Sequence, residues 1–97
     1  MSTADREAAQ RRLNDLVALV RSQPSQDQFT HLLEEADALG RAIGAFHLEA
    51  IRFRMYNVDR LVSHSPAALP AQATEIVADV RKHLEAAGFH TRSHHAP

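Results

Sequence analysis

Residues 26–63 read QDQFTHLLEEADALGRAIGAFHLEAIRFRMYNVDRLVS, and no proline interrupts the chain between Pro24 and Pro66. Apolar side chains recur through this stretch at steps of three and four residues, which is the spacing of one face of an α-helix. The pattern predicts an all-α fold with a long central helix over about residues 26–63.

The length of this helix sets the shape of the molecule. At 1.5 Å rise per residue it would span roughly 55 Å, whereas a compact domain of this size is only about 33 Å across. Gly40 and Gly44 mark the alternative, because each glycine costs about 1 kcal/mol of helix propensity. A break at Gly40–Gly44 would let the chain fold into a compact monomer of four helices.

The second half of the predicted helix carries more apolar side chains than one face accommodates. One stripe continues from the first half, and a second stripe lies beside it. A helix that is apolar over most of its circumference is buried over most of it. One neighbouring helix covers only one stripe. The two stripes are Ile43, Phe46, Ala50 and Phe53, and Leu48, Ile51, Met55, Val58 and Val62.

Self-association is the expected remedy for this apolar excess. Two central helices packed antiparallel about a twofold axis would complete a four-helix-bundle-like core. The chain is therefore predicted to have three helices and to dimerise, with association lost when Ile51 or Met55 is substituted. The predicted protein interface consists of Phe46, Leu48, Ile51, Phe53, Met55, Val58 and Val62.

Two further helices flank the central one. The first is predicted over about residues 3–22, because Pro24 disfavours helical geometry at the residue before it. The last is predicted to start at Pro66 or Pro70, since proline suits the first turn of a helix. Their buried stripes are Ala9, Leu13, Leu16, Val17 and Val20, and Ala73, Ile76, Val77, Val80, Leu84 and Ala87.

The end of the last helix is signalled by a glycine. Gly88 fits the left-handed position that closes many helices, and Phe89 can supply the apolar contact that accompanies it. Residues 1–89 are therefore predicted to form a single helical domain. Residues 90–97 are predicted to be a flexible, histidine-containing tail.

Composition excludes several classes of function. The 97 residues include 11 Lys and Arg and 12 Asp and Glu, so the formal net charge is −1 and attraction to nucleic acid or anionic membranes is not expected. The absence of cysteine excludes disulfides and thiolate chemistry. No stretch approaches the ~20 apolar residues of a membrane span. The first residues lack the apolar segment of a secretory signal, so we expect a cytoplasmic protein.

Seven histidines are the main chemical hint. With the last helix packed antiparallel on the central one, His83 would lie level with His47 and Glu49, a possible site for a metal or small ligand. Their alternative role is that of ordinary solvated or hydrogen-bonded side chains. The remaining histidines are His31, His64, His90, His94 and His95.

The expected function is that of a non-enzymatic interaction or regulatory protein, acting as a homodimer or as an adaptor for a protein partner. No catalytic constellation or cofactor motif is present in the sequence. Arginines interleaved with Tyr56 could contact phosphates, but Glu49 and Asp59 share that region, so nucleic-acid binding is not expected. The alternative function is a helical sensor with a ligand near His47, Glu49 and His83.

Overall fold

The computed structural model describes residues 3–24, 26–65 and 69–91. In these residues the chain is helical and has no strand, so the all-α prediction is confirmed. Among the described residues no helix is both long enough and apolar enough to cross a membrane. The elements are α1 (Thr3–Arg21), a 3-10 turn η1 (Asp27–Phe29), α2 (Thr30–Gly44), α3 (Leu48–Ser63) and α4 (Gln72–Ala86).

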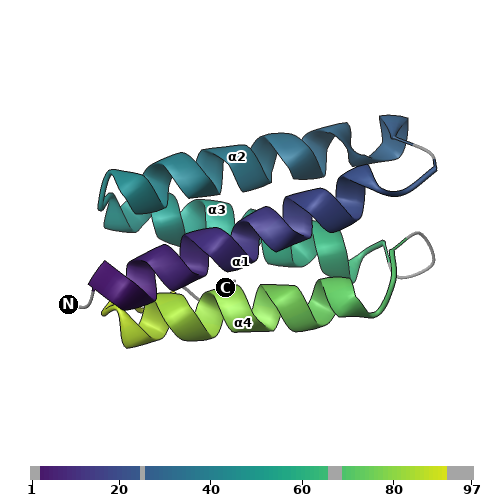
Figure 1. The fold of residues 1–97 in the computed structure, drawn as a ribbon. Coiled ribbons are helices and arrows are strands. Elements are labelled where there is room, and N and C mark those ends of the chain that lie inside the picture. The colour runs from purple at the N-terminus through teal and green to yellow at the C-terminus, as the bar shows by residue number, and fades with distance from the viewer. Residues whose placement is uncertain (1–2, 25, 66–68, 92–97) are drawn as a thin grey trace.

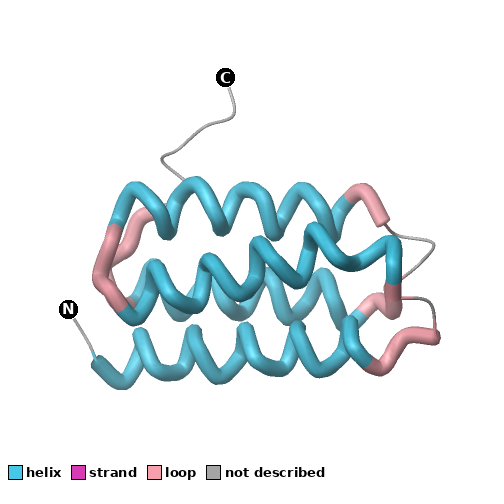
Figure 2. Tube along the Cα trace, turned by 90° about the horizontal axis from the view of Figure 1, so that it is seen from above, coloured by secondary structure: helices cyan, strands magenta, loops and turns pink. Residues whose placement is uncertain are grey.

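The four α-helices form an up-and-down bundle in which each runs antiparallel to the one before it (Figure 1). Helix α1 packs most closely on α4, and α2 packs most closely on α3. The view from above shows all four running along the same long axis (Figure 2). The described chain has a radius of gyration of 12.5 Å and extents of 38 × 30 × 20 Å.

The predicted central helix is two helices, and the three-helix chain is corrected to four. The break lies at residues 45–47, just beyond Gly44. Phe46 adopts a left-handed φ of 56°, its N–H donates to the carbonyl of Ile43, and the N–H of His47 donates to that of Ala42. This is the Schellman arrangement that closes a helix, here with phenylalanine where glycine is usual.

His47 then starts α3. Its backbone is extended, with φ −93° and ψ 91°, and its Nδ1 accepts a hydrogen bond of 3.2 Å from the N–H of Ala50. A side chain that caps the first turn satisfies a donor with no partner inside the helix. One helix therefore ends and another begins within three residues, and α3 folds back along α2.

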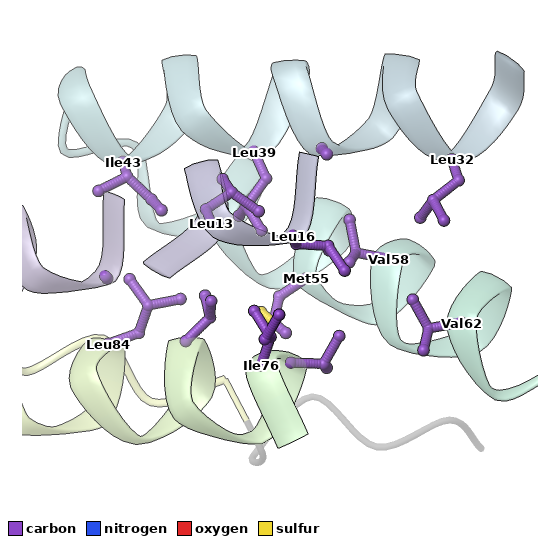
Figure 3. Close-up of a cluster of buried hydrophobic side chains, with 14 of the residues drawn as sticks. Leu13, Leu16, Leu32, Leu39, Ile43, Met55, Val58, Val62, Ile76 and Leu84 are labelled. Atoms are coloured by element: carbon purple, nitrogen blue, oxygen red, sulfur yellow. The ribbon is translucent and has the colours of Figure 1, made fainter. Parts of the chain in front are cut away.

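The core lies between the four helices and is closed within a single chain (Figure 3). The predicted stripes of the flanking helices are buried except for Val17, which is half-buried: Leu13, Leu16 and Val20 of α1 and Val80 and Leu84 of α4 are at most 3% exposed. Figure 3 shows Ile43, Leu39 and Leu32 of α2 opposite Met55, Val58 and Val62 of α3. Since α3 packs on both α2 and α4, the fold provides the second neighbour that the sequence was expected to lack.

The ends of the flanking helices follow the sequence signals closely. Helix α1 ends at Arg21, where the side chain of Gln26 donates to the carbonyl of Val20 at 3.0 Å. Helix α4 begins just beyond Pro70, and the alternative start at Pro66 lies outside the described residues. Gly88 has a φ of 100°, and the buried Phe89 donates its N–H to Leu84. Of the predicted tail, only residues 90 and 91 are described.

Replacing Gly40 and Gly88 by alanine is expected to change the stability of the fold in opposite directions. Gly40→Ala is expected to stabilise the fold by about 0.5–1 kcal/mol, because Gly40 is inside α2 and a Cβ there would make an ordinary 3.7 Å contact with Leu13. Gly88→Ala is expected to lower stability by about 1 kcal/mol, because of the positive φ. Urea unfolding followed by circular dichroism measures both. Equal changes in stability of the same sign would contradict the placement of Gly40 inside a helix and of Gly88 in the left-handed conformation.

Candidate functional site

The seven residues predicted to form a protein interface are divided by the structure into two groups. Four of them point into the core of the chain, where no partner can reach them; these are Ile51, Met55, Val58 and Val62, with 0%, 0%, 1% and 4% of their surface exposed. The other three, Phe46, Leu48 and Phe53, are 51%, 37% and 50% exposed. The break after α2 is the cause, because it turns the second apolar stripe toward α2 and α4.

Tyr56 joins the exposed group and was not among the predicted interface residues. It is 37% exposed and lies three residues after Phe53, so both side chains are on one face of α3. These four, Phe46, Leu48, Phe53 and Tyr56, are all the large hydrophobic residues that are exposed in the described part of the chain. We call them the 46–56 surface.

One end of this surface is built around Phe46. The rings of Phe46 and Phe89 have centroids 6.3 Å apart and are tilted by 47°. The guanidinium of Arg6, in the first turns of α1, lies 4.4 Å from the Phe46 centroid, which is within the range of a cation–π contact. Within the described residues the buried Nε of Arg6 has no hydrogen-bond partner. The α2–α3 turn, α1 and the end of α4 meet here.

The middle of the surface is supported by a buried carboxylate. Arg54, whose guanidinium carbon is 5.1 Å from the Phe53 ring centroid, donates to both oxygens of Glu35 at 3.1 and 2.9 Å. Asn57 donates to the same carboxylate at 2.9 Å. Burial raises the pKa of Glu35, but the hydrogen bonds from Asn57 and Arg54 and the charge of Arg54 outweigh it, and the pKa stays below its ordinary value.

The predicted ligand site at His47, Glu49 and His83 is not assembled as a metal site. His47 caps α3, Glu49 is exposed and 3.5 Å from Arg52, and His83 lies on α4. Among the described residues, which include these three, no group of three or more His, Asp or Glu side chains is placed to hold a metal ion. His94 and His95 lie outside the described residues.

A shallow groove follows the looser seam between α1 and α2. It has a volume of about 470 Å³, and Arg41 and Asp37 on its edge form an ion pair with each other. Gln10 crosses its floor to donate to the carbonyl of Gly40 at 3.4 Å. Its apolar lining consists of the buried Leu13 and Ala36 and the half-buried Val17 and Leu33. Two of its three charged side chains, Asp37 and Arg41, are thus paired with each other, and Arg21 is the third.

No protein-family model, curated protein or solved structure matches the chain. The candidate site therefore stands on the geometry of the exposed apolar residues between Phe46 and Tyr56.

Proposed function

We propose that the chain is a non-enzymatic protein-interaction domain that binds another protein chain, a second copy of itself or a different partner, through the 46–56 surface. One observation carries the proposal: the exposed large hydrophobic side chains of the described residues are confined to one connection and the first turns of the helix after it. Apolar surface in water is unfavourable by about 25 cal/mol per Å². Apolar side chains clustered on a surface are typical of sites that a second protein covers.

The fold itself does not require apolar side chains at these exposed positions. The core is closed within the chain, so Phe53 and Tyr56 could be polar without opening a cavity. Aromatic residues in such positions are typical of the residues that contribute most to protein binding.

The backbone at Phe46 supports the same proposal. A residue with a Cβ in the left-handed region costs about 1–2 kcal/mol relative to the right-handed one. Glycine would avoid this cost, as it does in the equivalent position at Gly88. A half-exposed phenylalanine held at such a position is better explained by contact with a partner than by packing alone.

The ionisable groups beside the surface that could act as an acid or base mostly have structural partners, which favours a binding role over a catalytic one. Glu35 is held by Arg54 and Asn57, Glu49 lies beside Arg52, and His47 caps α3. A catalytic acid or base needs a reactive proton or lone pair facing a substrate. Glu35 and His47 direct theirs at the protein.

The test is site-specific photocrosslinking in cells of the organism that encodes the chain. A photoreactive phenylalanine derivative replaces Phe53 in one variant and Ala18, exposed on the outside of α1, in a matched control. We expect a discrete covalent adduct from position 53 and none from position 18. The adducted protein, whether a second copy or another chain, is identified by its mass.

The purified partner must then bind the domain directly. We expect Phe53→Ser to weaken this binding at least tenfold and Ala18→Ser to leave it unchanged. If positions 46, 53 and 56 all give no adduct, or give the same adducts as position 18, the proposal is wrong.

A further inference from the structure

The outer face of α3 carries a line of four exposed side chains whose order is symmetric. Glu49, Phe53, Tyr56 and Arg60 follow one another at steps of four, three and four residues. Such steps keep side chains on one side of a helix, and they are also the spacing of the seam along which two helices pack in a coiled coil. Read from either end, the line has one charged residue, two aromatic residues and one residue of the opposite charge.

We propose that this line is a homodimer interface, in which α3 of one copy packs antiparallel on α3 of a second copy. The inference rests on the proposed function, since it takes the exposed face of α3 to be a protein-binding surface. The twofold axis passes midway between Phe53 and Tyr56. Such an isologous contact is the commonest way in which two identical chains pair.

In this register every side chain of the line has a complementary partner in the other copy. Phe53 of one copy lies opposite Tyr56 of the other, and the reverse pair forms on the other side of the axis. Glu49 of each copy lies opposite Arg60 of the other. The aromatic pairs cover the rings, which are 50% and 37% exposed in the single chain, and the ion pairs close both ends of the contact.

The ion pairs within the chain leave these two charges available. In the described residues, the ion pairs of α3 join Arg54 to Glu35, Asp59 to Arg81 and Arg52 to Glu49. Arg60 takes part in none of them. The Glu49–Arg52 pair is long, at 3.5 Å, and the Glu49 side chain is 75% exposed, so Glu49 keeps lone pairs for a second cation.

Charge also selects the direction of packing. If two α3 helices packed in parallel and in register, Glu49 would face Glu49 and Arg60 would face Arg60. Like charges held opposite each other disfavour such a pairing, and opposite charges fix the register of packed helices. Only the antiparallel arrangement about this axis brings each charge to its opposite.

The size of the contact predicts a reversible dimer. Helix α3 has 16 residues and is therefore about 24 Å long. One pair of such helices covers less than the ~800 Å² per partner of a standard stable interface. We expect monomer and dimer to exchange, with the dimer populated at high micromolar concentration.

The test is sedimentation equilibrium of the full chain with two charge reversals, Glu49→Arg and Arg60→Glu. Each reversal places like charges opposite each other at both ends of the dimer, so each variant alone is expected to dissociate at least tenfold more readily than the unchanged chain. A mixture of the two variants puts every arginine opposite a glutamate. We therefore expect the mixture to associate again, and the double variant to self-associate like the unchanged chain.

The controls are Glu75→Arg and Lys82→Glu, which make the same charge changes on exposed positions of α4. They are expected to leave the dissociation constant within twofold. Circular dichroism checks that each variant is folded, and only folded variants enter the comparison. Restored association in the mixture cannot arise from unfolding, because both chains would then have lost the interface.

Three results would overturn the homodimer. They are a chain that stays monomeric up to millimolar concentration, a dimer indifferent to both reversals, and a mixture that associates no better than its components. A monomeric chain that nevertheless forms a crosslinked adduct with another protein at position 53 would leave the proposed function standing. Absence of both self-association and adducts would remove both proposals.

Discussion

Met55→Ala is expected to lower the free energy of unfolding by about 2–5 kcal/mol, the range for deleting a large buried side chain from a packed core. Met55 is fully buried, and Figure 3 places it among side chains of the central core, near Leu16, Val58 and Ile76. The loss combines the apolar surface no longer transferred from water with the cavity left behind. Domains of this size have total stabilities of only about 5–15 kcal/mol, so much of the stability would be lost.

Phe53→Ala, two residues earlier on the same helix, is the matched control. Phe53 is half exposed, and we expect its truncation to change stability by no more than about 0.5 kcal/mol. Urea unfolding followed by far-ultraviolet circular dichroism measures both changes in stability. If the slope of the unfolding free energy against urea concentration is the same in both variants, the two-state comparison holds. Equal unfolding midpoints for the two variants would contradict the division of α3 into a buried and an exposed face.

This division is also where the sequence prediction departed from the structure. The periodicity of Leu48, Ile51, Met55, Val58 and Val62 identified a stripe that needs burial, and this is correct for all of them except Leu48, which is 37% exposed. It did not say which helix buries it. With one continuous helix, the stripe faces solvent until a second chain arrives. With the break at residues 45–47, α2 and α4 cover Ile51, Met55, Val58 and Val62 within the same chain.

The position of the break could not be predicted because the glycine that usually marks such a helix end is missing. Glycine commonly occupies the left-handed residue that ends a helix, and Gly88 was correctly interpreted in this way. At the end of α2 that position is held by Phe46, while Gly40 lies in the middle of α2 and Gly44 is its last residue. The propensity cost of the two glycines pointed to the right region but could not place the turn.

The flanking helices were predictable because their signals are local. Proline and glycine mark where α1 and α4 stop or start, and each helix has a single apolar stripe that faces a single core. The support of the candidate site depends on contacts between distant residues. Nothing in the sequence around Glu35 marks it as buried, because its partners Arg54 and Asn57 lie on the next helix beyond a break that had not been placed.

Glu35→Gln is expected to lower stability at neutral pH by about 2 kcal/mol, the range for hydrogen bonds to a buried charged group. The carboxylate is 8% exposed and accepts from both Arg54 and Asn57, and an amide loses the charge and one acceptor. Glu34→Gln is the matched control, because the neighbouring Glu34 side chain is 70% exposed and makes only a 3.9 Å contact with His31. We expect it to change stability by no more than about 0.5 kcal/mol.

The pH dependence gives the sharper test, because the folded state holds the pKa of Glu35 below its ordinary value. The unfolded chain then binds the proton more readily, so the stability from Glu35 is complete above the unfolded pKa of about 4.3 and is lost as the pH falls through the lower folded pKa. Urea unfolding of the unchanged chain and Glu35→Gln between pH 7 and pH 2 should therefore give stability curves that converge toward acid. Curves that stay parallel over this range would show that the Glu35 carboxylate is not held ionised by Arg54 and Asn57.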